Sequence, residues 1–112
     1  MSLREQLMRQ EGFRAMPYRD TVGKLTIGYG RNLTDKGVSR EEAAILLEND
    51  IREAESAVAK ALPWTMELDR PRFEVLVNMA FNLGIGGLLT FERMLAAVEE
   101  NSWELSAVEM LH

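Results

Sequence analysis

The chain has 112 residues, of which 46% are hydrophobic and 28% are charged, and these values fit one small globular domain or a shortened form of a larger one. Its net charge of −5 argues against a nucleic-acid binder, which needs a basic face to neutralise phosphates. With no cysteine and one histidine, His112, neither a disulfide nor a histidine-based metal site or triad is expected. No apolar run approaches the roughly 18 residues of a membrane span.

The first expected helix runs from about Leu3 to Glu11. Ser2 and Glu5 have the spacing of a capping box, in which a serine N-cap and a glutamate three residues later satisfy free backbone N–H groups. Gly12 fits the end of this helix, because glycine adopts positive φ angles without steric cost. The charged N-terminus also shows no apolar stretch of the kind found in a signal peptide.

A β-hairpin is expected directly after this helix. Residues 18–20 would lead into a turn over residues 20–24, and residues 24–28 would lead out of it. Residues 31–34 favour a short third strand, and residues 35–37 favour a turn.

This hairpin places two carboxylates, those of Glu11 and Asp20, at the edges of neighbouring elements, with Thr26 on the returning strand. Two carboxylates held apart by rigid structure are the minimum equipment for glycoside hydrolysis. One donates a proton to the leaving oxygen, and the other activates a water molecule or attacks the sugar. Because the chain contains 18 acidic residues, their spacing alone does not single out catalysis.

A long helix is expected next. Ser39 and Glu42 belong to a second capping box, and the helical pattern continues to about Leu62, where Pro63 ends it. At 1.5 Å per residue such a helix would be roughly 34 Å long, more than a small lobe needs. The sequence therefore predicts a strut that joins two lobes.

Asp69 has the pattern of an N-cap for a helix that covers residues 72–83 and is apolar almost all the way round. Such a helix is expected in the middle of a bundle. Its exception is a polar stripe, Glu74, Asn78 and Asn82, which either meets water or lines a cleft.

The rest of the chain is expected to be helical as well. Residues 84–87 favour a flexible turn, and a helix from about Leu88 or Thr90 to Glu100 follows. Ser102 would cap a last helix. The predicted buried face of the helix before it comprises Phe91, Met94, Leu95 and Val98.

One run of residues closely resembles the bacteriophage-type lysozymes, or endolysins (glycoside hydrolase family 24-like). The run matches in identity and spacing at Glu11, Gly12, Arg14, Tyr18, Asp20, Thr26, Ile27, Gly28 and Gly30. A second segment, residues 78–84, looks like the central helix of that family's larger lobe. Together the two segments place nearly the whole chain on the family's pattern.

The resemblance implies a lysozyme-like α+β fold. A small N-terminal lobe of one helix and a β-hairpin would cover residues 1–38, an interlobe helix residues 39–62, and a partial, mostly helical C-terminal lobe residues 63–112.

The same resemblance implies an enzyme that cleaves the β-1,4 bond between N-acetylmuramic acid and N-acetylglucosamine of peptidoglycan, with inversion, in host cell lysis. Glu11 would be the general acid, Asp20 its ionised partner, and Thr26 the residue that holds the attacking water. Inversion predicts carboxyl groups about 6.5–9.5 Å apart. No metal or organic cofactor is expected.

Further site residues are also implied by the resemblance. Asn32, Phe81 and Asn82 would contact the sugar. Arg31 would pair with Asp50, although two solvated side chains are the alternative.

Family members continue for several dozen residues beyond the point that matches His112, so the chain is interpreted as C-terminally truncated. The lost cover predicts an exposed apolar patch, and with it weak activity, no activity, or self-association. The alternatives are a peptidoglycan-binding module without catalysis and a regulatory helical protein with no glycan binding. The resemblance further implies a location in the host cytoplasm before lysis.

Overall fold

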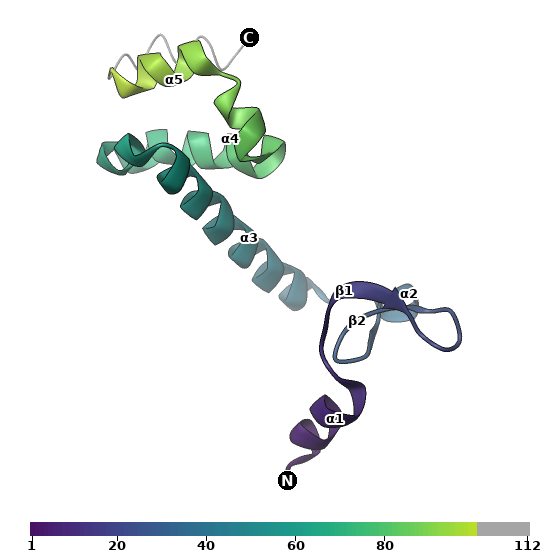
Figure 1. The fold of residues 1–112 in the computed structure, drawn as a ribbon. Coiled ribbons are helices and arrows are strands. Elements are labelled where there is room, and N and C mark those ends of the chain that lie inside the picture. Colours follow the sequence, from purple (N-terminus) through teal and green to yellow (C-terminus); the bar gives the residue numbers. More distant parts are fainter. Residues whose placement is uncertain (101–112) are drawn as a thin grey trace. The chain divides into compact units, whose positions relative to one another are not determined.

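The computed structural model describes residues 1–100, apart from the side chains of Glu92 and Ala97. The chain divides into two compact units, Met1–Ala44 and Ile45–His112, each of which is described by itself. In chain order the elements are α1 (Leu3–Glu11), β1 (Arg14–Arg19), β2 (Leu25–Gly28), β3 (Arg31–Asn32), α2 (Leu33–Lys36), α3 (Arg40–Ala61), the 3₁₀ helix η1 (Pro63–Glu67), α4 (Arg70–Leu89) and α5 (Glu92–Glu99) (Figure 1).

Both predicted ends of α1 are confirmed. The backbone N–H of Glu5 donates a hydrogen bond of 3.1 Å to Ser2 Oγ, as an N-cap requires. Gly12 follows the helix with a φ of 70°, and its N–H donates to the carbonyl of Met8 at 3.0 Å. Capping residues therefore fix the point at which α1 gives way to the sheet.

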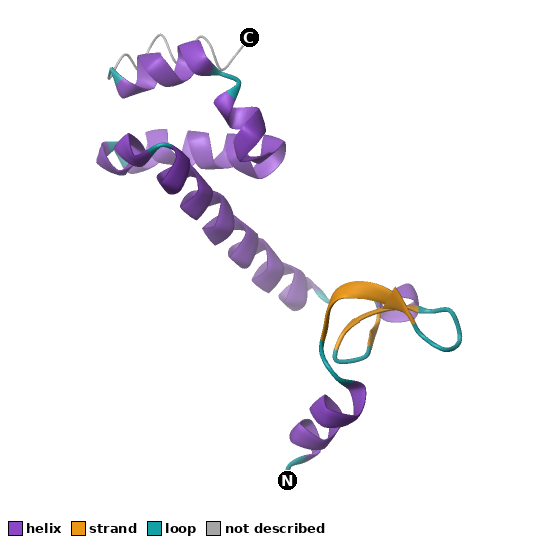
Figure 2. Cartoon of the chain, in the orientation of Figure 1, coloured by secondary structure: helices purple, strands orange, loops and turns teal. Residues whose placement is uncertain are grey.

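The sheet is antiparallel, with the strand order β1-β2-β3 (Figure 2). Thr26, in the central strand, lies opposite Tyr18 on one side and Asn32 on the other. The β1 strand begins earlier than the predicted residue 18, and its pairing with β2 is irregular between Arg14 and Tyr18. An irregular edge strand accommodates Pro17, which cannot donate a backbone hydrogen bond.

The prediction of a third strand over residues 31–34 is wrong in its second half. The strand ends at Asn32, and the chain then makes the short helix α2. The reason is a competing local cap: Asn32 Oδ1 accepts a hydrogen bond of 3.0 Å from the backbone N–H of Asp35, which starts a helical turn. Gly37 ends that turn with a φ of 60°, where a simple turn was expected.

The long helix is confirmed as α3. Its capping box is reciprocal, because Glu42 N–H donates to Ser39 Oγ (3.1 Å) and Ser39 N–H donates to Glu42 Oε1 (2.8 Å). The helix has 22 residues and ends at Ala61, before Pro63. It begins in the first unit and continues into the second.

The α4 helix begins as predicted, with the N–H of Arg72 donating to Asp69 Oδ1 at 3.1 Å. It does not stop at Gly84, where a turn over residues 84–87 was expected. Gly84 instead makes a kink, with a φ of 75° and a ψ of 162°, and helical structure resumes as far as Leu89. Helix α5 accordingly begins at Glu92, later than predicted. The helix predicted after Ser102 lies outside the described residues.

The buried apolar residues that the structure describes all belong to the second unit: Ala54, Val58, Phe73, Leu76, Val77, Ala80, Leu88, Met94, Leu95 and Val98. Only the second half of α3 contributes to this core. Leu47, in the first half of α3, is 50% exposed. Of residues 1–44, all of which are described, Thr26 alone is buried. The first unit therefore depends on turns and hydrogen bonds more than on a core.

None of the helices within residues 1–100 is both long enough and apolar enough to span a membrane.

Candidate functional site

The Glu11 carboxylate lies against the backbone of Gly30, between β2 and β3. A methyl group on Gly30 would lie 2.7 Å from Glu11 Oε2, so the carboxylate occupies the space that a side chain at position 30 would need. The ring of Phe13, two residues after Glu11, contacts the ring of Tyr29, which precedes Gly30, with centroids 5.5 Å apart. The end of α1 is thus in contact with the far end of the hairpin.

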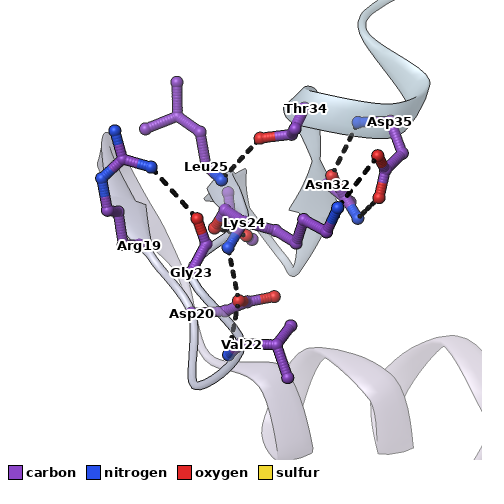
Figure 3. Close-up of polar contacts among 10 residues, drawn as sticks. Arg19, Asp20, Val22, Gly23, Lys24, Leu25, Asn32, Thr34 and Asp35 are labelled. Atoms are coloured by element: carbon purple, nitrogen blue, oxygen red, sulfur yellow. Dashed lines mark hydrogen bonds and ion pairs between the residues drawn. The ribbon is translucent and has the colours of Figure 1, made fainter.

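Asp20 organises the hairpin turn (Figure 3). Its Oδ1 accepts hydrogen bonds from the backbone N–H groups of Val22 (3.0 Å) and Lys24 (2.8 Å). The backbone closes the same turn, since Asp20 N–H donates to Lys24 O at 2.9 Å and Gly23 N–H donates to Asp20 O at 3.0 Å. This pattern is an Asx turn, a structural role that is complete without catalysis. The hydrogen bonds described within residues 1–100 that involve the Asp20 side chain all use Oδ1.

Thr26 is linked to Asp20 through one backbone group. Its Oγ1 donates a hydrogen bond of 3.0 Å to the carbonyl of Lys24, the same carbonyl that accepts from Asp20 N–H. Thr26 is only 3% exposed, and its hydroxyl proton is already engaged. Toward a bound water, Thr26 therefore offers a hydrogen-bond acceptor rather than a donor.

Asn32 caps α2 beside this turn (Figure 3). In addition to its bond from Asp35 N–H, its Nδ2 donates to Asp35 Oδ2 at 3.0 Å, and Lys24 Nζ lies 3.3 Å from Asp35 Oδ1. These two contacts, that of Asn32 first, lower the pKa of Asp35. Thr34 Oγ1 also accepts from the N–H of Leu25 at 2.8 Å, which joins α2 to β2. The role of Asn32 in sugar binding stays a prediction.

Arg31 makes an ion pair with Glu42, which the sequence analysis did not single out as its partner. Arg31 Nη1 donates to Glu42 Oε1 at 2.7 Å and to the carbonyl of Gly37 at 3.1 Å, while Nη2 donates to Glu42 Oε2. The bond from Arg31, followed by that from the backbone of Ser39, lowers the pKa of Glu42 to about 2. The expected partner Asp50 belongs to the other unit, and its pairing with Arg31 stays a prediction.

The second unit holds the remaining candidates, which line a groove of about 410 Å³ on α3 and α4. Its lining residues are Leu47, Ile51, Glu55, Arg70, Glu74, Val77, Asn78, Phe81 and Asn82. The polar stripe of α4 lines this groove, and all three of its residues are also exposed, so it meets water as well. Asn82 Nδ2 donates to the carbonyl and to Oδ1 of Asn78, at 2.8 and 2.7 Å.

Glu11, Asp20, Thr26 and Asn32 thus belong to one unit, and Phe81 and Asn82 line one groove of the other. That one cleft holds all six residues stays a prediction. Two features were missed by sequence reasoning: the Arg31–Glu42 pair and the contact of Glu11 with Gly30. Gly28 and Gly30, which follow Thr26, indicate that a group can approach this backbone closely, but they do not identify Glu11 as that group.

Known proteins resemble this chain over nearly its whole length. Residues 8–112 match the family model described as phage lysozyme. The pre-baseplate central spike protein Gp5 of Enterobacteria phage T4 is 32% identical over 132 aligned positions, which cover 93% of this chain and 23% of that protein. Two probable T4-type lysozymes of Dictyostelium discoideum are 25% and 28% identical, and each alignment covers 97% of this chain and 81% of the relative.

A fourth relative, the endolysin of Bacillus phage B103, is 30% identical over 108 aligned positions, which cover 93% of this chain and 39% of that protein. The chain therefore spans about a quarter of Gp5 and well under half of this endolysin. The alignments with Gp5 and the Dictyostelium proteins are longer than the 112 residues of this chain, so those relatives carry insertions. The match over residues 8–112 shows that the chain belongs to the phage lysozyme family and has its lysozyme-like α+β fold.

Proposed function

We propose that this chain hydrolyses bacterial peptidoglycan at the β-1,4 bond between N-acetylmuramic acid and N-acetylglucosamine, with inversion, during host cell lysis. The observation that carries the proposal is the arrangement of the first unit. Two carboxylates, those of Glu11 and Asp20, are held by separate backbone contacts, and Thr26 shares one of the contacts of Asp20. Membership of the phage lysozyme family supports it.

In the proposed reaction Glu11, in its protonated form, gives its proton to the oxygen of the leaving sugar as the glycosidic bond breaks. A water molecule attacks the anomeric carbon from the opposite face. Asp20 takes one proton of this water on Oδ2, because Oδ1 is engaged with the turn. Thr26 Oγ1 accepts the second hydrogen bond of the water, which directs a lone pair of the water oxygen at the carbon. No metal or organic cofactor enters.

Inversion requires the two carboxyl groups to stand about 6.5–9.5 Å apart, with the water between Asp20 and the sugar. Phe81, which is 44% exposed, would pack against a sugar face. Asn82 Oδ1 would accept a hydrogen bond from a sugar hydroxyl, because Asn82 Nδ2 already donates to Asn78. Asn32 would contribute a further polar contact from the sheet.

A second candidate function is a module without catalysis that binds peptidoglycan or associates with itself, and the structure bears on the self-association. One observation favours it: Ile45, Leu46 and Leu47, consecutive on α3, are 63%, 53% and 50% exposed. Burying these side chains against other copies of the chain would remove apolar surface from water. A location in the host cytoplasm before lysis, expected from the resemblance, is likewise a proposal.

The test compares the parent chain with Glu11→Gln and with a matched control, Glu41→Gln. Glu41 is an exposed glutamate of α3 for which no contact with the candidate site is described. Each protein is incubated with purified peptidoglycan, and both turbidity loss and the release of reducing ends are followed. Clearing that disappears in E11Q and persists in E41Q would support the proposal.

The opposite results are equally informative. Clearing by E11Q at the parent's rate would refute the assignment of Glu11. A folded parent that sediments with the wall but releases no reducing ends would favour the binding module. Sedimentation velocity of the parent and of Leu46→Glu would then decide whether these exposed residues of α3 join copies of the chain.

A further inference from the structure

We propose that Gly30 is a positioning residue for Glu11: because it has no side chain, its backbone provides the surface on which the Glu11 carboxylate rests. The inference rests on the proposed function, in which Glu11 is the general acid, and deepens it. It assigns a role to a residue outside the proposed acid, base and water-holding residues.

The contact is specific to one side chain. The three atoms nearest to a methyl group at position 30 would be Glu11 Oε2 at 2.7 Å, Cδ at 3.0 Å and Cγ at 3.3 Å. The distance of 2.7 Å is too short for a non-bonded contact between carbon and oxygen. A side chain at position 30 would therefore exclude the Glu11 carboxylate from its present position. All three atoms lie toward the flexible end of Glu11, so the side chain of Glu11 would yield before the backbone does.

Two contacts flank the approach of Glu11 to Gly30. On the side of α1, Gly12 closes the helix through its bond to Met8. Phe13, two residues after Glu11, then meets the ring of Tyr29, which directly precedes Gly30. Because the atoms that a methyl group would meet belong to the flexible end of Glu11, a side chain at position 30 would rotate the Glu11 carboxylate away.

Backbone geometry offers a competing reason for the glycine. Gly30 has a φ of 80°, which side-chain-bearing residues rarely adopt. Gly37 supplies a matched control, since its φ is 60° but a methyl group there would meet no atom within 4 Å. Alanine at either position suffers the same kind of strain, whereas only alanine at position 30 displaces a carboxylate.

The experiment compares Gly30→Ala with Gly37→Ala. Urea unfolding should show similar losses of stability in both. On soluble peptidoglycan fragments, kcat of G30A should fall about 100-fold, the order expected when a reacting group is displaced by about 1 Å, while KM stays near the parent value. G37A should keep both constants. Equal kcat values for the two variants would overturn the inference while leaving the assignment of Glu11 intact.

A spectroscopic measurement tests the placement without reference to activity. In the parent, the Hα protons of Gly30 should show nuclear Overhauser effects to the Hγ protons of Glu11, and the absence of these effects would overturn the inference even if G30A fails to fold. The ¹³C carboxyl resonance of Glu11, assigned by its loss in E11Q, should shift in G30A and remain in place in G37A. If E11Q proves fully active, the assignment of Glu11 as the general acid fails, and the role of Gly30 in catalysis fails with it.

Discussion

Asp20 has two roles that different substitutions can separate. Its Oδ1 holds the hairpin turn through the N–H groups of Val22 and Lys24, and its Oδ2 is the proposed base. In Asp20→Asn the amide oxygen can accept the same two hydrogen bonds, but the base is gone. In Asp20→Ala both are lost.

The expected magnitudes follow from the two bonds. Each contributes on the order of 0.5–1.5 kcal/mol net, so D20A should lose about 1–3 kcal/mol of unfolding free energy. That is a large share of the roughly 5–15 kcal/mol of a typical domain. D20N should lose much less. Its rate of peptidoglycan clearing should nevertheless fall by about 10²–10⁴, the usual contribution of a general base.

Urea unfolding followed by far-ultraviolet circular dichroism measures the loss of unfolding free energy, and release of reducing ends from peptidoglycan measures the loss of catalytic rate. The result that would refute the reasoning is a D20N protein that clears at the parent's rate, because Asp20 would then be a turn residue only. A D20A protein as stable as the parent would show that the Oδ1 bonds do not hold the turn.

Two further predictions concern neighbouring contacts. Arg31 lowers the pKa of Glu42 from 4.5 to about 2. The ion pair should therefore stabilise the fold fully above about pH 4.5 and lose this effect as the pH falls toward 2. Urea unfolding midpoints of E42Q, measured against those of the parent across this pH range, should lack that part of the acid dependence. Thr26→Val keeps the shape but removes the hydroxyl, so clearing should fall while stability drops by only about 0.5–1.5 kcal/mol, since Lys24 O still accepts from Asp20; T26S should clear normally.

Local chemistry explains which parts of the fold could be predicted from sequence. The caps at Ser2, Gly12 and Asp69 act over three or four residues, and each lies where its spacing predicted it. The errors occurred where two local preferences compete. Asn32 can end a strand or cap a helix, and the cap prevails. Gly84 can stop a helix or kink it, and here the helix resumes.

The candidate site shows a similar limit. The resemblance, not the spacing of acidic residues, selected Glu11 and Asp20, and the structure adds how each is held. Contacts between distant segments have no local signal: nothing in the sequence distinguishes Glu42 from its neighbours as the partner of Arg31. The same holds for the contact of Glu11 with Gly30, because glycine spacing indicates conformational freedom and not what approaches the backbone.

The two units separate stability from the geometry of the candidate acid and base. The described core lies in the second unit, in residues 54–98, so deleting a buried side chain such as that of Leu76 would cost about 2–5 kcal/mol there. In the first unit the proposed acid and base are placed by a cap, an Asx turn and a missing side chain. Each of these is a local contact that holds one group of the proposed acid or base. Substitutions that keep these contacts and change only the reacting group, such as D20N, should therefore affect activity well before they affect folding.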